Sequence, residues 1–468
     1  MSPDFLSRVQ FALTASFHFI FPPLSIGLGL FLVVVGVLYL RTRDPKWRQL
    51  SFFWVRIYGL VFALGVATGI VQEFEFGTNW AVYSRFVGNI FGSLLAAEGI
   101  FAFFLEGGFL GLMLFGGTRL GPRLWLLATA LVALGAHFSA IWIVMANSWM
   151  QTPVGYTIEQ TANGPMAFMT SFREVLATPS FLPRIMHTFV ASWMVGLSLV
   201  LSVSAYYLLR DRHHELAKSA MRVALPIFVV LSLAQALYFG PEQAVSVTEH
   251  QPAKLAALEG LWETTGCAPL YLVGWVDEAA QTTVGLSVPC LLSFLATGDF
   301  NAVIDGLRAF PPDTWAPVNL TFQVYHIMIN LGGVFVAIGL LGALFYFWRQ
   351  RIFHTRWLLW VFVGTIVLTE LATLSGWWTA EFGRQPWIVW ELLRTADAVS
   401  PTLESIQVLL SNLMFIVLYI ILFVLFLYLL NEKIQHGPEP LEKLEGQPVS
   451  SLPDTFRDVF RHRARASH

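Results

Sequence analysis

The chain has 468 residues, of which 56% are hydrophobic, 15% aromatic and only 12% charged. Its mean hydropathy of +0.63 is far higher than a soluble core requires and predicts a polytopic membrane protein. The net charge of -2 leaves no basic excess for nucleic acid, and the two cysteines are too few for an iron–sulfur cluster or a structural zinc site.

Nine apolar stretches are long enough to cross a hydrocarbon layer of roughly 30 Å. They cover residues 12–40, 51–72, 90–116, 125–147, 186–209, 219–240, 320–347, 357–376 and 403–430. The sequence therefore predicts an all-α, polytopic membrane protein with nine transmembrane helices. Its first residues contain no small-residue cleavage site, so we expect the first helix to be retained.

Lys and Arg gather in the connections after the first, third, fifth and seventh predicted helices, while the alternate connections are poorer in cations. The positive-inside rule then predicts the N-terminus outside and the C-terminus inside. Four regions follow along the chain: helices one to six in 1–240, which carry several of the ligand candidates named below, an ordered outer loop in 241–318, helices seven to nine in 319–430, and a flexible cytoplasmic tail in 431–468.

Ionisable groups inside a membrane are costly, so each one is a functional candidate. With this topology His18, His187, Met328 and Glu381 lie toward the outer face, and Glu98 lies in the outer half of the third helix. Singly, each histidine is explained as an interfacial side chain and the methionine as core filling. Together, nitrogen, thioether and carboxylate groups at one depth are suitable ligands for haem iron.

A second carboxylate, Glu106, follows Glu98 by eight residues, which places it about 12 Å further toward the inner side of an α-helix. The two carboxylates, extended by Ser139 in the fourth helix, would carry protons from the inner side to a reaction near the outer face. The alternative for Glu106 is a protonated carboxyl that holds neighbouring helices together.

Several stretches resemble subunit I of the cytochrome bd quinol oxidases over almost the whole chain. They are residues 7–14 (SRVQFALT) leading to His18, 67–80 (ATGIVQEFEFGTNW), 98–106 (EGIFAFFLE), 142–153 (WIVMANSWMQTP) and 376–387 (GWWTAEFGRQPW), the last being highly specific. Residues 254–259 (KLAALE) resemble the quinol-loop signature of that family, and Ile327-Met328 resembles its methionine-ligand helix.

The resemblance implies three haems. His187 and Met328 would be the axial ligands of a low-spin haem b, the first electron acceptor from quinol. His18 and Glu381 would serve a high-spin haem b and a third haem, either d or b, with Glu98 close to one of them. Which of these two haems each residue serves is left open, and a short outer loop, as in the cyanide-insensitive branch, leaves the third haem type open as well.

The resemblance also implies roles in quinol binding for Lys254 and Glu259, and in proton transfer for Glu106 and Ser139. Three more residues are expected near haem propionates or between the haems: Arg384, Trp377 and Arg8.

His326 is a departure, because the family commonly has Arg two residues before its methionine ligand. A protonated His326 would keep a charge-balancing role near a propionate. His326 and Met328 stand about 200° apart around a helix, so only one can face the same iron. The resemblance favours Met328, whereas the greater affinity of histidine for iron favours His326.

The implied activity is oxidation of membrane quinol and reduction of O2 to water, which generates a proton motive force without pumping. Expected partners are a haem-free subunit II in a heterodimer, a possible small single-helix subunit, membrane quinone and O2, in a bacterial or archaeal cytoplasmic (inner) membrane. A haem-free transporter or proton channel is the alternative, and a haem–copper oxidase is a third. Cys267 and Cys290 both fall in the outer loop, and whether they form a disulfide is left open.

Overall fold

The computed structural model describes residues 2–116 and 120–440, with only the backbone at 101–103. Within these residues, nine helical segments are long and apolar enough to cross a membrane, which confirms the predicted nine-helix fold. The segments are α1 (Pro3–His18) with α2 (Phe21–Thr42); α3 (Pro45–Thr78); α4 (Ala81–Ala97) with the π-helix η1 (Glu98–Phe103) and α5 (Phe104–Phe115); α6 (Pro122–Gln151); α7 (Phe172–Leu176) with α8 (Phe181–Leu209); α9 (His214–Ala234) with the π-helix η2 (Gln235–Phe239) and α10 (Gly240–His250); α13 (Val318–Phe347); α14 (Arg356–Phe382); and α15 (Ser405–His436).

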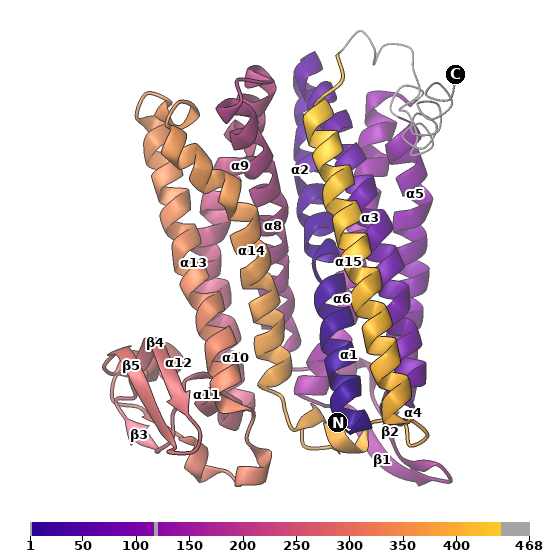
Figure 1. The fold of residues 1–468 in the computed structure, drawn as a ribbon, viewed down its shortest axis with the longest axis vertical. Coiled ribbons are helices and arrows are strands. Elements are labelled where there is room, and N and C mark those ends of the chain that lie inside the picture. Colours follow the sequence, from indigo (N-terminus) through magenta and orange to yellow (C-terminus); the bar gives the residue numbers. More distant parts are fainter. Residues whose placement is uncertain (1, 117–119, 441–468) are drawn as a thin grey trace.

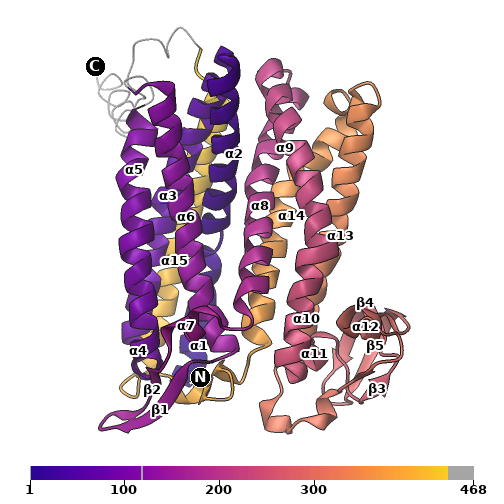
Figure 2. The ribbon, with the colours of Figure 1, turned by 180° about the vertical axis from the view of Figure 1, so that it is seen from behind.

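The helices run side by side along the long axis of the molecule (Figure 1). The N-terminus, the small sheets and the connection 251–317 lie at one end, which we call the loop end. The short turns around 43–44, 210–213 and 348–355 lie at the other, which we call the cationic end because it carries most of the Lys and Arg. Seen from behind, α8, α9, α13 and α14 form one group of helices, and α1 to α6 with α15 form another (Figure 2).

The two groups meet where α2 crosses α8. A Cβ atom on Gly27 of α2 would overlap the backbone at Ser192 and Gly196, and a Cβ on Gly196 of α8 would overlap the backbone of Gly27. The helices therefore touch backbone to backbone, a contact that only glycine permits on both sides. Around it pack large side chains that are fully buried, among them Phe31 and Trp54.

The helices are longer than their apolar cores predict. The first begins at Pro3 and breaks after His18, ahead of Pro22 and Pro23, which cannot donate to the preceding turn. The sixth continues past residue 240 to His250, so the connection starts at 251 rather than 241. The ninth continues to His436, which makes the start of the predicted tail helical. The rest of that tail, from 441 to 468, lies outside the described residues.

The connection 251–317 is ordered. It contains α11 (Pro252–Leu258), α12 (Leu291–Thr297), the antiparallel pairs β3 (Thr265–Gly266) with β6 (Val303–Ile304) and β4 (Leu270–Asp277) with β5 (Thr282–Val288), and the 3-10 turns η3 (Leu307–Ala309) and η4 (Pro312–Thr314). A disulfide joins Cys267 to Cys290. Leu255, Leu292 and Ile304 are among the residues of its own small core.

Two further hairpins cover the loop end of the helices. They are β1 (Tyr156–Thr161) with β2 (Gly164–Met169), and β7 (Trp387–Val389) with β8 (Leu393–Arg394), and both pairs are antiparallel. The remaining 3-10 turns are η5 (Arg351–Phe353) and η6 (Thr395–Asp397). All four small sheets thus lie outside the spanning helices, so the membrane part is all-α.

We predict that Gly196→Ala separates α2 from α8. The added methyl group has no space against the Gly27 backbone, and overpacking of this kind costs about 1–3 kcal/mol. The thermal unfolding temperature of the purified protein should fall. Gly364→Ala on α14 is the matched control, because no atom lies within 4 Å of its added Cβ. Equal unfolding temperatures for the two variants would contradict the packing argument.

Candidate functional site

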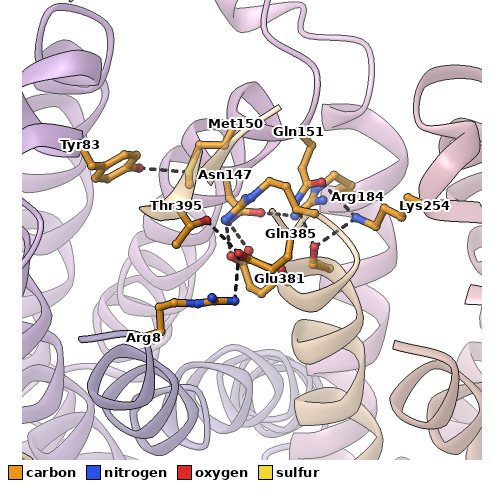
Figure 3. Close-up of polar contacts among 12 residues, drawn as sticks. Arg8, Tyr83, Asn147, Met150, Gln151, Arg184, Lys254, Glu381, Gln385 and Thr395 are labelled. Atoms are coloured by element: carbon orange, nitrogen blue, oxygen red, sulfur yellow. Dashed lines mark hydrogen bonds and ion pairs between the residues drawn. The ribbon is translucent and has the colours of Figure 1, made fainter. Parts of the chain in front are cut away.

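Buried charged side chains gather at the loop end, where α6, α8 and α14 meet (Figure 3). Glu381, in the last turn of α14, accepts a hydrogen bond from Asn147 Nδ2 at 2.9 Å and is paired with Arg384. Asn147 of α6 also accepts from Arg184 of α8. The Asn147 amide therefore connects the carboxylate of one helix with the guanidinium of another.

Lys254 belongs to the same cluster. Its Nζ donates to Gln151 Oε1 at 3.0 Å and to the Ala380 carbonyl oxygen at 3.1 Å, so the first turn of α11 is attached to the end of α14. The side chain is only 3% exposed. Burial, and then the nearby positive charges of Arg184 and Arg384, lower the pKa of Lys254 well below its usual range.

The cluster contains three basic side chains and one carboxylate, and several donors have no acceptor. Arg384 Nε and Nη1 and Arg184 Nε are buried without a hydrogen-bond partner among the described residues. Leaving charged donors unpaired is costly, and a planar anion is the group that a guanidinium binds best. The haem propionates implied by the resemblance are such anions, so these residues fit a haem edge.

Thr68 holds the ring of His18. The His18 Nδ1 lies 2.9 Å from Thr68 Oγ1, and the Thr68 hydroxyl has the Leu64 carbonyl oxygen as an acceptor at 2.8 Å. When the hydroxyl donates to that carbonyl, Thr68 accepts from Nδ1 and the lone pair is on Nε2, the arrangement of a metal-ligating histidine. Gly69 makes room for the ring, because a Cβ there would lie 3.2 Å from His18 Cε1.

The helix bounds place two of these residues further along their spans than the apolar stretches suggest. His18 is the last residue of α1, inside the span Pro3–Thr42. Glu98 lies at the middle of the span Ala81–Phe115. The difference arises because the polar first turns of these helices fall outside the apolar stretches, and the depth of both residues in a membrane stays a prediction.

His187 is held by the π-turn of η2. Its Nδ1 lies 3.1 Å from Gln235 Nε2 and 3.4 Å from the Phe239 carbonyl oxygen, whereas its Nε2 has no hydrogen-bond partner among the described residues. The Met328 sulfur on α13 packs against Gly376 of α14, where a Cβ would approach it to 2.9 Å. The helices that carry His187 and Met328 both pack against α14.

His326 is already engaged. Its Nδ1 lies 2.8 Å from the Phe322 carbonyl oxygen, its Nε2 lies 2.9 Å from the Tyr271 carbonyl oxygen, and its ring stacks on Phe322. Both ring nitrogens thus face backbone acceptors, and the side chain joins α13 to β4. This geometry leaves His326 no nitrogen for iron and gives no support to a role at a propionate.

The two carboxylates of the third span each have one hydroxyl partner. Ser139 Oγ of α6 donates to Glu98 Oε1 at 2.6 Å, and the Tyr58 hydroxyl of α3 donates to Glu106 Oε1 at 2.9 Å. Gly135 of α6 lies directly against the backbone of Glu106, which allows α5 and α6 to approach closely. Both carboxylates are therefore turned toward the interior of the helix bundle.

Glu259 and Lys254 lie on different sides of α11, and no hydrogen bond or ion pair joins them among the described residues. Glu259 is 1% exposed and faces the Tyr325 hydroxyl of α13, although its carboxyl oxygens form no regular hydrogen bond with described residues. Burial raises the pKa of Glu259 to about 8, against a smaller opposite effect of Tyr325. This carboxyl therefore changes charge near neutral pH.

Arg8 and Trp377 lie at the edge of the cluster. Arg8 donates to Gln385 Oε1 at 3.2 Å, so it reaches the turn after α14 but not the Glu381 carboxylate (Figure 3). Trp377 packs against the rings of Phe11 and Phe19.

No three His, Cys, Asp or Glu side chains among the described residues could hold one metal ion together. His18, His187, Glu98 and Glu381 are thus not ligands of a single ion, although each remains available as a separate axial ligand.

Sequence reasoning missed two buried carboxylates and several partners of the cluster. Glu75 of α3 accepts from Thr14 Oγ1 at 2.6 Å, and Glu370 of α14 has both oxygens buried without a partner among the described residues. Glu370 stands in the apolar stretch 357–376, so the criterion that selected Glu98 could also have selected it, whereas Glu75 lies three residues beyond the stretch 51–72. The partners supplied by other helices had no such signal: Tyr58, Asn147, Gln151, Arg184 and Tyr325.

A family model described as cytochrome bd terminal oxidase subunit I matches residues 6–438. The chain belongs to this family. It is 36% identical to cytochrome bd ubiquinol oxidase subunit 1 of Bacillus subtilis (strain 168), over 97% of this chain and 98% of the relative. It is 33% identical to cytochrome bd-II ubiquinol oxidase subunit 1 of Escherichia coli (strain K12), over 93% and 97%.

The fold agrees with this membership. The solved structure of bd oxidase from Geobacillus thermodenitrificans superposes with a TM-score of 0.87 at 27% identity, covering 93% of this chain and 99% of that one. The chain is therefore a multi-pass membrane subunit of a quinol:O2 oxidoreductase, in the family of bd oxidases. Membership removes the transporter, proton-channel and haem–copper alternatives.

We predict that Asn147→Leu destabilises the site. The substitution leaves Glu381 without one donor and Arg184 without its acceptor, and a buried group left unpaired costs about 1–3 kcal/mol or more when charged. Thermal unfolding of the purified protein measures this loss. Asn163→Leu, at the exposed turn of the β1–β2 hairpin, is the control and should change little. A loss as large in the control would show that the cluster is not the cause.

Proposed function

We propose that this subunit oxidises membrane quinol and passes the electrons through three haems to O2, which is reduced to water. The observation that carries the proposal is the buried excess of basic groups around Glu381, whose unpaired donors suit haem propionates. The lone pair on His18 Nε2 and the unpaired Nε2 of His187 support it, because each is a nitrogen ready for axial ligation.

The haems would be held by residues of five spans. His187 and Met328 would hold the low-spin haem b, and His18, Glu381 and Glu98 would serve the high-spin haem b and the third haem, of type d or b. Bound haems would supply the one-electron chemistry and the binding of O2. Arg384 and Arg184 would pair with the propionates and fix their orientation. Trp377 and Arg8 would pack at the edge of the cluster around Glu381.

Glu259 would take the proton that quinol loses on oxidation. Its pKa of about 8 is high enough to hold a proton at neutral pH and low enough to release it to water at the loop end. Lys254 would donate a hydrogen bond to the quinol head group and connect it to α14, since its Nζ already contacts the Ala380 carbonyl oxygen beside Glu381. The quinol site would therefore lie next to the haem site.

Protons for water formation would come from the cationic end of the molecule. Glu106 lies nearer that end than Glu98, and the Tyr58 and Ser139 hydroxyls hydrogen-bonded to the two carboxylates would extend the path. The cation-rich turns support placing this end inside the cell, with the N-terminus outside. Taking protons from one side and releasing quinol protons on the other would store energy without a pump.

The protein would work in the cytoplasmic (inner) membrane of a bacterium or archaeon, as a heterodimer with a subunit II and with room for a small single-helix subunit. The names of the relatives, which number them as subunit 1, support a partner. Two spans in particular leave their apolar side chains uncovered, since only 13% of the apolar stretch of Ala81–Phe115 and 11% of that of Ser405–His436 is buried. These surfaces would meet a partner helix or lipid.

We predict that Met328→Leu removes the low-spin haem b signal or converts it to a high-spin signal, because leucine has no lone pair for iron. Quinol oxidation should stop while the high-spin haem bands persist. Reduced-minus-oxidised optical spectra and O2 uptake with quinol measure both effects.

His326→Gln is the matched control for Met328→Leu, since His326 contacts backbone carbonyls instead of iron. It should keep a six-coordinate low-spin spectrum. Loss of the low-spin band in His326→Gln with its retention in Met328→Leu would overturn the ligand assignment, and absence of every haem band in the unmodified protein would overturn the proposed function.

We predict that quinol oxidation rises with pH up to about 8, because Glu259 accepts a proton only when it is ionised. The ionised fraction grows as the pH approaches the pKa, so the rate should grow with it. Glu259→Gln should lower the rate and abolish this pH dependence, as measured by steady-state quinol oxidation between pH 6 and pH 9.

O2 uptake driven by an artificial donor that reduces the haems directly is the control for Glu259→Gln and should be largely unchanged. Loss of both activities together would indicate misfolding or a haem role for Glu259 instead of a quinol role.

A further inference from the structure

The β4–β5 hairpin has an uncovered apolar face. Val273 stands opposite Leu286 and Trp275 stands opposite Val284, so all four side chains point to the same side of the two-stranded sheet. They are 63%, 65%, 63% and 74% exposed, respectively. A water-facing strand surface usually carries polar side chains, so this face calls for an apolar covering.

The backbone of β4 is fastened along α13. Asn319 accepts from the Val276 amide at 3.2 Å, Gln323 donates to the Gly274 carbonyl at 2.8 Å, and Asn330 donates to the Leu272 carbonyl at 2.9 Å. His326 contacts the Tyr271 carbonyl between them. These four polar residues lie on one face of α13 and span about 16 Å of its length, so the hairpin lies beside the helix, not beyond its end.

This part of α13 lies at the edge of the membrane. The helix has 30 residues, about 45 Å, whereas the hydrocarbon layer is roughly 30 Å thick. From 331 to 347 the helix has no charged residue and no Asn, Gln or His, and the cationic turn follows directly. The excess length is therefore at the beginning of α13, in the interfacial region, which is where the hairpin lies.

The charged residues of the hairpin lie at its tip, on the side away from the apolar part of α13. The hairpin tip, next to the start of α13, carries Asp277 and Glu278, whereas residues 283–298 contain no Asp, Glu, Lys or Arg. Beyond β5, the exposed rings of Phe294 and Phe300 stack with their centroids 4.4 Å apart and continue the apolar surface. The polar tip is thus directed away from the membrane and the apolar part toward it.

We propose that the outer face of the β4–β5 hairpin rests on the lipid of the bilayer, at the boundary of head groups and acyl chains. On α13, Leu320 and Ile327 each follow a residue that contacts β4, and they are 46% and 40% exposed. Trp275 suits this depth, because tryptophan is enriched at membrane interfaces. An apolar surface of this kind usually enters the interface by roughly 5–10 Å.

The inner face of the hairpin connects this lipid contact to the quinol residues. Thr283 Oγ1 donates to the Gly260 carbonyl at 2.6 Å, directly after Glu259. The role of this contact in quinol access rests on the proposed function, in which a lipid-soluble quinol would reach Glu259 along a hairpin that is itself held in the bilayer. The lipid contact alone does not depend on quinol chemistry.

The test uses single engineered cysteines in the assembled oxidase. The two native cysteines form a disulfide, so Leu286→Cys on the outer face and Ala280→Cys at the hairpin tip can each be labelled selectively with an environment-sensitive fluorophore. The labelled enzymes are placed in nanodiscs with and without lipids that carry a quenching nitroxide in the upper acyl chain. We expect Leu286→Cys to lose about half or more of its emission and Ala280→Cys to lose little, since only the former is at interfacial depth.

Emission from Leu286→Cys that is unchanged by the nitroxide lipids would overturn the proposal. Failure of Leu286→Cys to take up the label in the folded complex would also overturn it, because a protein partner would then cover the face instead of lipid. Equal quenching at Leu286→Cys and Ala280→Cys would overturn the orientation argued here. Because the readout is fluorescence, it remains decisive even where the proposed quinol role of Glu259 fails.

A second pair of variants tests the consequence for turnover. Leu286→Glu adds a charge on the outer face, and Thr282→Glu adds the same charge at an exposed position near the tip. Leu286→Glu should raise the apparent KM for a long-tailed quinol in vesicles several-fold while haem content and the KM for a short-chain quinol stay unchanged. Equal KM values for the two variants with both quinols would remove the connection to quinol access.

Discussion

The buried basic groups around Glu381 constrain how the helices meet at the loop end. Lys254 and Arg384 are 3% and 2% exposed, and ions removed from water need partners that recover their lost hydration. Here the partners come from different helices: Asn147 of α6 joins Arg184 of α8 to Glu381 of α14. The helices must therefore meet at this point and in this order. An anion bound by the unsatisfied guanidinium donors would therefore add to the stability of the fold.

The same constraint explains why α11 belongs to the buried cluster as well as to the outer loop. Lys254 ends on the Ala380 carbonyl oxygen, one residue before Glu381, while the other end of the short helix presents Glu259 to α13. α11 thus spans from the cluster around Glu381 to the helix that carries Met328. Under the proposed function, one helical segment between the quinol site and a haem would keep their separation fixed, which electron transfer to a haem requires.

Much of the fold was predictable because membrane helices are selected by apolar length, and nine such lengths are readable in the sequence. The ends of these helices were not predictable, because a helix continues past the hydrocarbon layer wherever its polar turns contact other groups. The segment α10, which continues to His250, is an example. In the site, the residue types of His18, His187 and Glu381 indicated haem chemistry, but the groups that orient them come from other helices. Thr68, Gln235 and Asn147 orient these three residues through contacts that no spacing in the sequence encodes.

The π-turns show how local backbone geometry decides what the candidate residues can do. In a regular α-helix Glu98 and Glu106 would stand about 80° apart, on different faces. The π-helix Glu98–Phe103 takes up about one extra residue, which turns the following helix back by roughly 100° and brings the two carboxylates close to one face. That face meets α6, where Ser139 donates to the Glu98 carboxylate and Gly135, one turn away, lies against the backbone and Cβ of Glu106. The Glu106 carboxylate is then paired with Tyr58 of α3. A straight helix would turn Glu106 away from these contacts by roughly 100°, so a proton path through both carboxylates would depend on this local change of register.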